Sequence, residues 1–275
     1  MFVTKSTGEK QPFRPEKIIN TCLRAGAPKD LAYAIAHEVG RRAHDGISTK
    51  KILRLTLRLL EEERPSLAAR YDLKDAIARL GPAGYQFEIF IAEILKEYGY
   101  RAQLPPPVRG ACVEHEIDII AEKNGVRAMI ECKYRRESGI YIGIKEALYT
   151  WARFLDLKDG YTAGKCQKFD KCWLVCNTRF SDDVSKYAHC KQMVLLGWHY
   201  PRDKGLERMI EDKKIYPITV LRKLDQDSRK KLAKAELMLC RDLQKTDFYQ
   251  LEKMTKIKAD KLIALIQEAR DVLSD

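Results

Sequence analysis

The chain has 275 residues, of which 45% are hydrophobic and 33% are charged, so it is long enough for two or three domains with hydrophobic cores. It contains no run of about 18 apolar residues, and its N-terminal stretch MFVTKSTGEK lacks the apolar centre of a signal peptide. These features exclude a protein with membrane-spanning helices and predict a cytoplasmic protein without a membrane partner. The formal net charge of +12 favours a polyanionic partner such as nucleic acid.

Eight cysteines are spread along the chain without a secretory context. Zinc binding by Cys166, Cys172, Cys176 and Cys190 is conceivable, but the paired C-x2-C knuckles that are typical of zinc sites are missing. We therefore expect free thiols, most of them buried in apolar segments.

The first 75 or so residues have the pattern of a small α+β domain. Two short strands, at VTK and near Gln11, are separated by a turn at Gly8, and helical periodicity follows in KIINTCLRAGA. We expect a second helix, DLAYAIAHEVGRRA, with Asp30 as its N-cap, and a third, STKKILRLTLRLLEEE, with Ser48 as its N-cap. The segment GISTKKI is then a loop that leads into the third helix.

This stretch resembles the ATP-cone, a regulatory nucleotide-binding module of ribonucleotide reductases and of their transcriptional repressor. The resemblance rests on VTKSTGEKQPFRPEKI and on the later G-x-x-T before a helix, with Ser6 where the family usually has Arg. It implies ATP or dATP as a regulatory ligand. The residues it assigns to the nucleotide are Lys5, Lys17 and Thr49 for the phosphates and Gln11 and Arg14 for the base or ribose. The alternative is a structural adaptor whose lysines are solvated.

No G-x-x-x-x-G-K-[ST] loop occurs in the chain, so we expect the nucleotide to act as a regulator and not as fuel.

The segment GPAGYQFEIFIAEILKEYGY predicts a largely buried helix that ends at Gly99. Glu88 lies among its apolar residues, where a carboxylate either has a partner or reaches solvent.

The next segment, HEIDIIAEKNGVRAMIECKYRR, predicts two strands joined by a type I′ turn at Asn124-Gly125. The turn sets the register, which places Asp118 opposite Glu131 across the strand pair. One strand-pair face is expected to be core and the other to be a charged cluster containing Lys133. The expected core face carries Ile117, Ile119, Ala121, Ala128, Ile130 and Cys132, and the other carries Glu116, Asp118, Ile120, Met129, Glu131 and Lys133.

Opposed carboxylates are destabilising unless something compensates their charge. A Mg²⁺ or Mn²⁺ ion held by Asp118, Glu131 and the main-chain carbonyl of Cys132 would do so, and Lys133 could then orient a water or stabilise a phosphate. The alternative is a solvated hairpin face with cross-strand salt bridges.

Helix and strand patterns then alternate through GIKEALYTWARFLDL, FDKCWLVCN, SDDVSKYAHC and MVLLGWHYP, which indicates an α/β fold. The ordered elements G-x-x-F-E, Asp, turn, E-x-K and N-T-x-F-S resemble an Mrr-type restriction endonuclease domain of the PD-(D/E)xK nuclease superfamily. The resemblance implies a mixed sheet flanked by helices. It implies that Asp118 and Glu131 bind metal, that Lys133 is catalytic and that Glu88 completes the site. Glu131 stands where many Mrr-type members have Gln.

The expected function is a Mg²⁺-dependent endonuclease acting on DNA and regulated by an adenine nucleotide. The alternative is a catalytically silent DNA-binding or nucleotide-responsive regulatory protein. The structure of the substrate stays open, RNA included. Tyr134, Arg135, Arg136 and Lys145 are candidates for phosphate contacts or for a solvated rim.

We expect three domains, at residues 1–78, 79–221 and 222–275, and a homo-oligomer. The last domain is helical and loosely resembles helix-hairpin-helix modules, although its loop TKIKAD lacks their glycines. A plain helical interaction or dimerisation module is the alternative.

Overall fold

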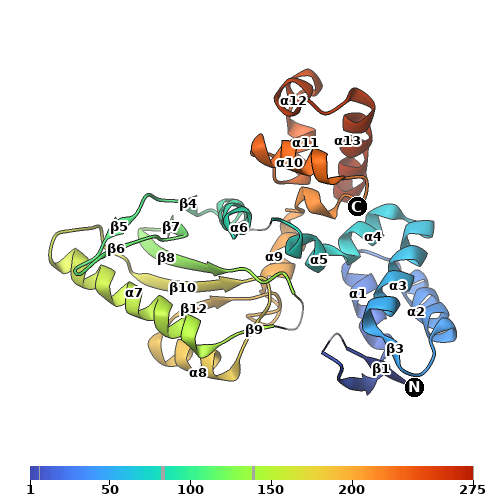
Figure 1. Ribbon diagram of the computed structural model, residues 1–275, viewed down its shortest axis with the longest axis horizontal. Helices are drawn as coiled ribbons and strands as arrows, with labels where there is room; N and C mark the ends of the chain where they lie inside the picture. Colours follow the sequence, from blue (N-terminus) through green and yellow to red (C-terminus); the bar gives the residue numbers. More distant parts are fainter. Residues whose placement is uncertain (6, 82–83, 138–139, 275) are drawn as a thin grey trace. The chain divides into compact units, whose positions relative to one another are not determined.

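The computed structural model describes residues 1–5, 7–81, 84–137 and 140–274 and forms two compact units (Figure 1). One unit joins Met1–Ala76 with Tyr216–Asp275, and the other is Ile77–Ile215. Ser6, which departs from the ATP-cone pattern, lies outside the described residues. No helix in the described part of the chain is long and apolar enough to cross a membrane.

The unit Ile77–Ile215 is built on a five-stranded mixed sheet in the order β12-β10-β8-β7-β4. The strands β8, β10 and β12 are parallel to one another, whereas β7 is antiparallel to both β8 and β4. Their bounds are β4 Arg101–Gln103, β7 Ile119–Lys123, β8 Val126–Lys133, β10 Lys171–Cys176 and β12 Val194–Leu196. The α/β class predicted from the sequence is confirmed.

Helices cover both faces of this sheet, with α7 along one face and α6 by the other (Figure 1). The helices of the unit are α6 Tyr85–Glu97, α7 Ile144–Thr162, α8 Asp182–Lys191 and α9 Leu206–Lys213. Four short strands lie beside the sheet: β5 Val108–Arg109, β6 Glu114–His115, β9 Tyr141–Ile142 and β11 Arg179–Phe180. As predicted, α6 is largely buried and its chain turns at Gly99, which has a φ of 83°.

The hairpin of β7 and β8 has the predicted turn, with positive φ at both Asn124 (53°) and Gly125 (75°). The predicted register is confirmed where the strands pair, from Lys123 with Val126 to Ile119 with Ile130. Pairing ends there, because β7 begins at Ile119. Asp118 therefore does not oppose Glu131 within the ladder, which corrects the sequence-based expectation.

The second face of the hairpin is also core, and this is a further correction. Met129 is fully buried in a hydrophobic cluster with Phe154 and Leu157 of α7, so the charged cluster occupies only the end of this face. Ile117 belongs to the same cluster as Met129 and not to the expected face of Ile119. It lies outside the ladder, where strict alternation of side chains no longer holds.

The N-terminal part of the other unit carries a three-stranded sheet in the order β2-β1-β3. Its elements are β1 Phe2–Thr4, β2 Lys10–Pro12, α1 Pro15–Arg24, α2 Lys29–Arg42, β3 Ile47–Ser48, α3 Thr49–Glu63, α4 Pro65–Tyr71 and the start of α5 Leu73–Ala78, whose last two residues belong to the other unit. Ser48 caps α3 as predicted, accepting the N–H of Lys51 at 3.2 Å. Two expectations were wrong here. Strand β3 was taken for a loop because two residues carry no periodicity, and α2 begins at Lys29 with Pro28 as its N-cap, so Asp30 lies in the first turn.

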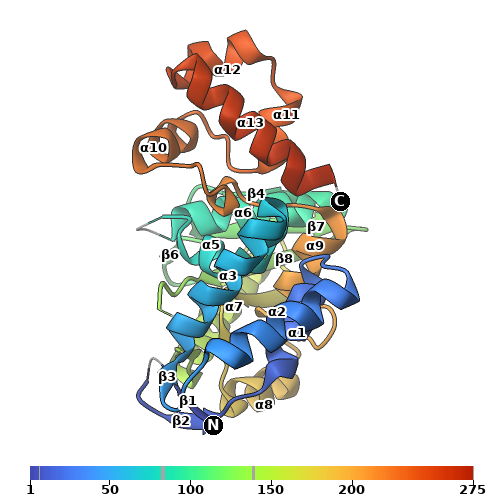
Figure 2. The same cartoon turned by 90° about the vertical axis from the view of Figure 1, so that its right-hand side faces the viewer.

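The C-terminal helices pack in the same unit, with α13 beside α11 (Figure 2). They are η1 Ile218–Val220, α10 Gln226–Lys234, α11 Cys240–Lys245, α12 Phe248–Thr255 and α13 Ala259–Ser274. Arg70 of α4 is buried and donates from Nε and Nη2 to the carbonyl of Val272, at 3.0 and 2.7 Å. The buried carboxylate of Glu268 accepts the main-chain N–H groups of Arg222 and Lys223. The cone and the C-terminal helices thus share polar contacts at buried positions.

Candidate active site

Four predicted residues come from three neighbouring elements of the unit Ile77–Ile215. Helix α6 carries Glu88 in its first turn, Asp118 directly precedes β7, and β8 carries Glu131 and Lys133 near its end. Because β7 and β8 are antiparallel, the start of β7 and the end of β8 lie at the same end of the sheet, which brings Asp118 close to Glu131 and Lys133.

The side chain of Asp118 turns toward β8, where its Oδ2 accepts the main-chain N–H of Cys132 at 2.6 Å. Burial, followed by the charge of Glu131, raises the pKa of Asp118 to about 6. Burial, followed by the charges of Asp118 and Glu131, raises the pKa of Glu88 to about 7. The carboxyl groups of Glu88, Asp118 and Glu131 therefore lie close enough to interact. Such a group of partly buried acids favours a bound cation.

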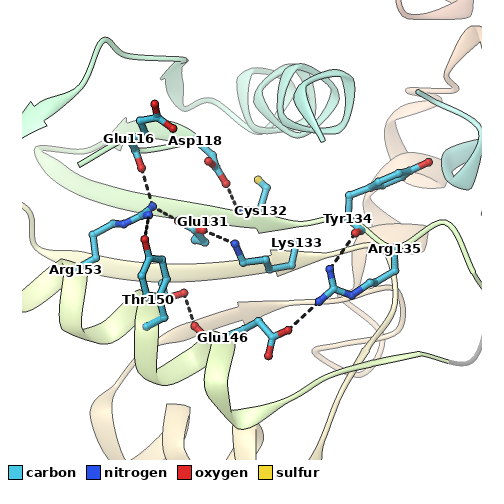
Figure 3. Close-up of polar contacts among 11 residues, drawn as sticks. Glu116, Asp118, Glu131, Cys132, Lys133, Tyr134, Arg135, Glu146, Thr150 and Arg153 are labelled. Atoms are coloured by element: carbon cyan, nitrogen blue, oxygen red, sulfur yellow. Dashed lines mark hydrogen bonds and ion pairs between the residues drawn. The ribbon is translucent and has the colours of Figure 1, made fainter. Parts of the chain in front are cut away.

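Glu131 is the most buried of these carboxylates, with 4% of its side chain exposed. Its Oε1 accepts from Lys133 Nζ at 2.5 Å, and its Oε2 accepts from Nη1 of Arg153 on α7 (Figure 3). The charge that the sequence analysis expected a metal to compensate is thus also compensated by two cations of the chain itself.

Arg153 is the site residue that the sequence analysis missed. Its guanidinium also donates to the carbonyl of Glu116 at 2.6 Å (Figure 3). It donates to the hydroxyl of Tyr149 at 2.7 Å as well. The spacing of Tyr149 and Arg153 by one helical turn was visible in the sequence. That Arg153 contacts Glu131 follows only from how α7 packs on the sheet.

The donor chemistry of the site fits a hard divalent cation, because Asp118, Glu131 and the carbonyl of Cys132 offer oxygen atoms. The thiol of Cys132 is not such a donor, since burial raises its pKa well above the usual value. In the described residues no three His, Cys, Asp or Glu side chains are grouped as a metal site. A metal ion bound by Asp118 and Glu131 would therefore also need the main-chain carbonyl of Cys132 and water as ligands. Lys133 and Arg153, which are paired with Glu131, would have to move.

Two of the expected phosphate-contacting residues have partners within the protein. The hydroxyl of Tyr134 donates to the carbonyl of Ala78. Arg135 Nη2 pairs with Glu146 at 2.8 Å (Figure 3). Both side chains are thereby held by contacts within the protein. Lys145, by contrast, is exposed on α7.

The predicted nucleotide residues lie on the small sheet and on the helices next to it. Pairing of Thr4 with Ser48 brings the chain positions of Lys5 and Thr49 together at the ends of β1 and β3. Lys17 Nζ donates to Gln11 Oε1 at 3.4 Å, and Lys5 pairs with Glu9 at 2.7 Å. Arg14 is the N-cap residue of α1, and its side chain does not cap the helix.

The eight cysteines have free thiols. Cys172 and Cys176 are buried on β10, whereas Cys190 is exposed. In the described part of the chain no three His, Cys, Asp or Glu side chains are grouped as a metal site.

Family models match three consecutive parts of the chain. The ATP cone domain matches residues 1–74, the archaeal Holliday junction resolvase (hjc) matches residues 82–178, and the AF1548-like C-terminal domain matches residues 216–273. The chain is therefore an ATP-cone followed by a nuclease-type domain with the PD-(D/E)xK fold, as the sequence motifs predicted, and the combination indicates a nucleotide-regulated nuclease.

An uncharacterized protein from Archaeoglobus fulgidus is 40% identical to the chain over 184 residues, which are 66% of this chain and 99% of the relative. The crystal structure of AF1548, described as a protein of unknown function, is also similar. It has a TM-score of 0.60 and 38% identity, and the match covers 70% of this chain and 99% of that one. The chain belongs to the same family as the Archaeoglobus fulgidus protein.

Proposed function

We propose that the protein is a metal-dependent endonuclease that cleaves branched DNA and is regulated by ATP or dATP bound to its cone. The observation that carries the proposal is the cluster of Glu88, Asp118, Glu131 and Lys133 at one end of the sheet, with raised pKa values for Glu88 and Asp118. The match to the resolvase model supports a four-way junction as the substrate to test first.

In this mechanism Asp118, Glu131 and the Cys132 carbonyl would hold Mg²⁺ or Mn²⁺. When bound, the ion lowers the pKa of a water and stabilises charge on the phosphate. Lys133, whose Nζ is held 2.5 Å from Glu131, would orient the attacking water or stabilise the developing phosphate charge. Asp118 would keep its orientation through the N–H of Cys132. Glu88, with its raised pKa, would exchange protons near neutral pH.

The nucleotide would act through assembly or DNA affinity without being hydrolysed, because the chain has no phosphate-binding loop of the ATPase type. A coupling of about 1–3 kcal/mol between nucleotide and DNA would suffice.

A second function, a silent DNA-binding regulator, is favoured by one observation. Both carboxylate oxygens of Glu131 are paired with cations of the chain, which would have to rearrange before a metal binds.

Incubating the protein with a labelled four-way junction, a linear duplex or a single strand tests the proposal. The reactions contain Mg²⁺, Mn²⁺ or EDTA, with and without ATP, dATP or a non-hydrolysable analogue. We expect metal-dependent cleavage of the junction that is lost in Lys133→Ala and kept in Lys171→Ala, a matched change at an exposed position of β10. Binding without cleavage under every metal condition would instead support the silent regulator.

A further inference from the structure

A groove lies in the unit Ile77–Ile215 where β4, β5 and β7 meet the end of α7 (Figure 1). Its lining comes from the segments 101–109 and 165–169 and from Ile120, Glu122 and Arg127 of the β7–β8 hairpin. Its volume of about 610 Å³ is typical of ligand sites. The groove is separate from the candidate active site, because Glu131 lies four residues from Arg127 along β8, about 13 Å away, with the buried Met129 between them.

Two segments that line the groove are held in place by the fold. Three consecutive prolines, 105–107, connect β4 to β5, and their rings fix φ and leave this connection little freedom. In the segment after α7, Lys165 donates from Nζ to the carbonyl of Ala111 at 2.6 Å. Where that segment ends, the N–H of Asp170 donates to the carbonyl of Arg127 at 2.8 Å. A groove that is formed before binding costs little conformational entropy when a ligand enters.

The groove has an excess of positive charge. Its lining includes four cations and two acids, which are Arg101, Arg109, Arg127, Lys165, Glu114 and Glu122. Arg101 and Arg127 both pair with Glu122, at 2.7 and 3.1 Å, so one carboxylate orients two guanidinium groups and neutralises only one of them. Arg109 is exposed and has no partner among the described residues. The groove therefore favours a ligand with negative charge.

The groove also offers apolar surface and amide groups. Ile120 and Cys166 are half-buried in its lining, and Phe169 is buried. Gln103 and Gln167 line the same groove, and both are exposed without a partner in the described part of the chain. An amide presents a donor and an acceptor together, the combination that pairs with the edge of a nucleobase. The apolar surface, the amides and the guanidinium groups thus match the face of a base, its edge and a phosphate.

A second, smaller hollow extends the groove to the turn of the β7–β8 hairpin. It has a volume of about 300 Å³ and reaches Gly125 in the turn. Three residues line both hollows, namely Glu122, Arg127 and Gln167. The additional room fits a chain of nucleotides better than one free nucleotide. A duplex keeps its bases stacked inside, so only unpaired nucleotides can place a base in a hollow of this size.

We propose that this groove binds unpaired nucleotides of a DNA strand, with the bases at Ile120 and the two amides and the phosphates at Arg101 and Arg109. An acidic protein segment would match the cations alone, whereas a nucleotide also matches the apolar surface and the amides. For the proposed nuclease, the groove would favour branched DNA with a single-stranded arm over a fully paired junction. This consequence rests on the proposed nuclease function, whereas strand binding does not.

Fluorescence anisotropy of the intact protein in EDTA tests strand binding without cleavage. The probes are a short labelled thymidine strand and an abasic strand of equal length, which carries the same phosphates without bases. Thymidine avoids the adenine nucleotide site that we expect in the cone. The thymidine strand should bind at least about tenfold more tightly, because only this strand can place bases in the groove. Equal binding of the two strands would overturn the proposal.

Two substitutions locate the binding in the groove. Arg109→Glu puts an acid where the proposal places a phosphate, and Gln167→Glu puts one beside a base. Each should raise the dissociation constant of the thymidine strand about tenfold. The matched changes Arg202→Glu and Gln192→Glu, at exposed positions elsewhere in this unit, should leave the constant unchanged. Circular dichroism checks that every variant is folded, and folded groove variants that bind the strand like wild type would overturn the proposal.

Crosslinking and competition identify the site and the ligand. A strand that contains thiothymidine should crosslink to the segments 101–109 or 165–170, as mapped by mass spectrometry, and crosslinks confined to other segments would overturn the proposal. Thymidine monophosphate should compete only at concentrations at least about tenfold above that of the strand. Competition at equal concentration would assign the groove to a free nucleotide instead. Failure of cleavage while the strand still binds the groove would bear on the nuclease function alone.

Discussion

Arg153 of α7 and Glu131 of β8 form an ion pair in the interior of the nuclease-type unit, with 11% and 4% of their side chains exposed. Lys133 holds the other carboxylate oxygen of Glu131, so one buried acid is shared by two cations. The pair links α7 to the residue that we propose as a metal ligand.

Replacing Arg153 separates its structural and positioning roles. Arg153→Met should lower the free energy of unfolding by about 1–3 kcal/mol, less than for a buried acid left wholly unpaired, because Lys133 stays with Glu131. It should also change Mn²⁺ affinity measured by calorimetry, since one oxygen of Glu131 is released. Arg153→Lys, which keeps the charge, should recover part of both effects. Unchanged stability and unchanged Mn²⁺ binding in Arg153→Met would show that the Arg153–Glu131 pair neither stabilises the fold nor positions Glu131.

Glu131→Gln should abolish cleavage while the protein stays folded. The amide keeps the shape of the side chain but loses the charge that would hold a metal ion and Lys133. We expect single-turnover cleavage to fall by at least about 100-fold, the size seen when one group that stabilises transition-state charge is removed. Full metal-dependent cleavage by this variant, purified free of host nucleases, would contradict the assignment.

Two substitutions of Asp118 distinguish its ligand role from its hydrogen bond. Asp118→Asn keeps an oxygen that can accept the N–H of Cys132, so stability should change little while Mg²⁺ affinity falls. Asp118→Ala also leaves that N–H unpaired and should cost about 1–3 kcal/mol of stability. Urea unfolding and metal titration of both variants measure the two effects, and equal stability losses would argue against the hydrogen bond.

Acid should weaken the contacts that Asp156 makes from α7 to the 112–115 segment. The N–H of Cys112 at 2.9 Å and then the ring of His115 at 2.7 Å hold the pKa of Asp156 well below its usual range. A lowered folded-state pKa gives stability that is present above the unfolded-state pKa of about 4 and lost as the pH falls through the folded value. Asp156→Asn should therefore be less stable than wild type at neutral pH.

The difference between Asp156→Asn and wild type should shrink below about pH 4. Urea unfolding across this pH range measures it, with Asp203→Asn at an exposed loop position as the control. A stability difference that does not change with pH would mean that the charge of Asp156 is not what stabilises the segment.

Lys5→Ala together with Lys17→Ala should weaken ATP or dATP binding, because each charge-assisted phosphate contact is worth about 1.5–3 kcal/mol. Calorimetry measures the loss, and Lys29→Ala with Lys253→Ala removes the same net charge elsewhere. The nucleotide should be recovered unhydrolysed. An intact protein that binds neither nucleotide would leave the cone as a structural adaptor.

Local sequence signals determined a large part of the secondary structure and of the fold of this protein. Asn124-Gly125 sets the hairpin register, Ser48 begins α3, and the apolar spacing in α6 buries that helix, because each of these depends on residues a few positions apart. The PD-(D/E)xK fold and the ATP-cone could be recognised for the same reason, since their motifs are short and ordered along the chain.

Tertiary structure alone decided what surrounds Glu131. The sequence did not show that pairing of β7 ends at Ile119, which frees Asp118 to bond Cys132, or that α7 covers the face carrying Met129. Arg153 lies 22 residues from Glu131 along the chain, and no periodicity relates them. Contacts between separate elements depend on how whole faces pack, so a buried ion pair of this kind is determined by the packing of α7 on the sheet and not by a local pattern.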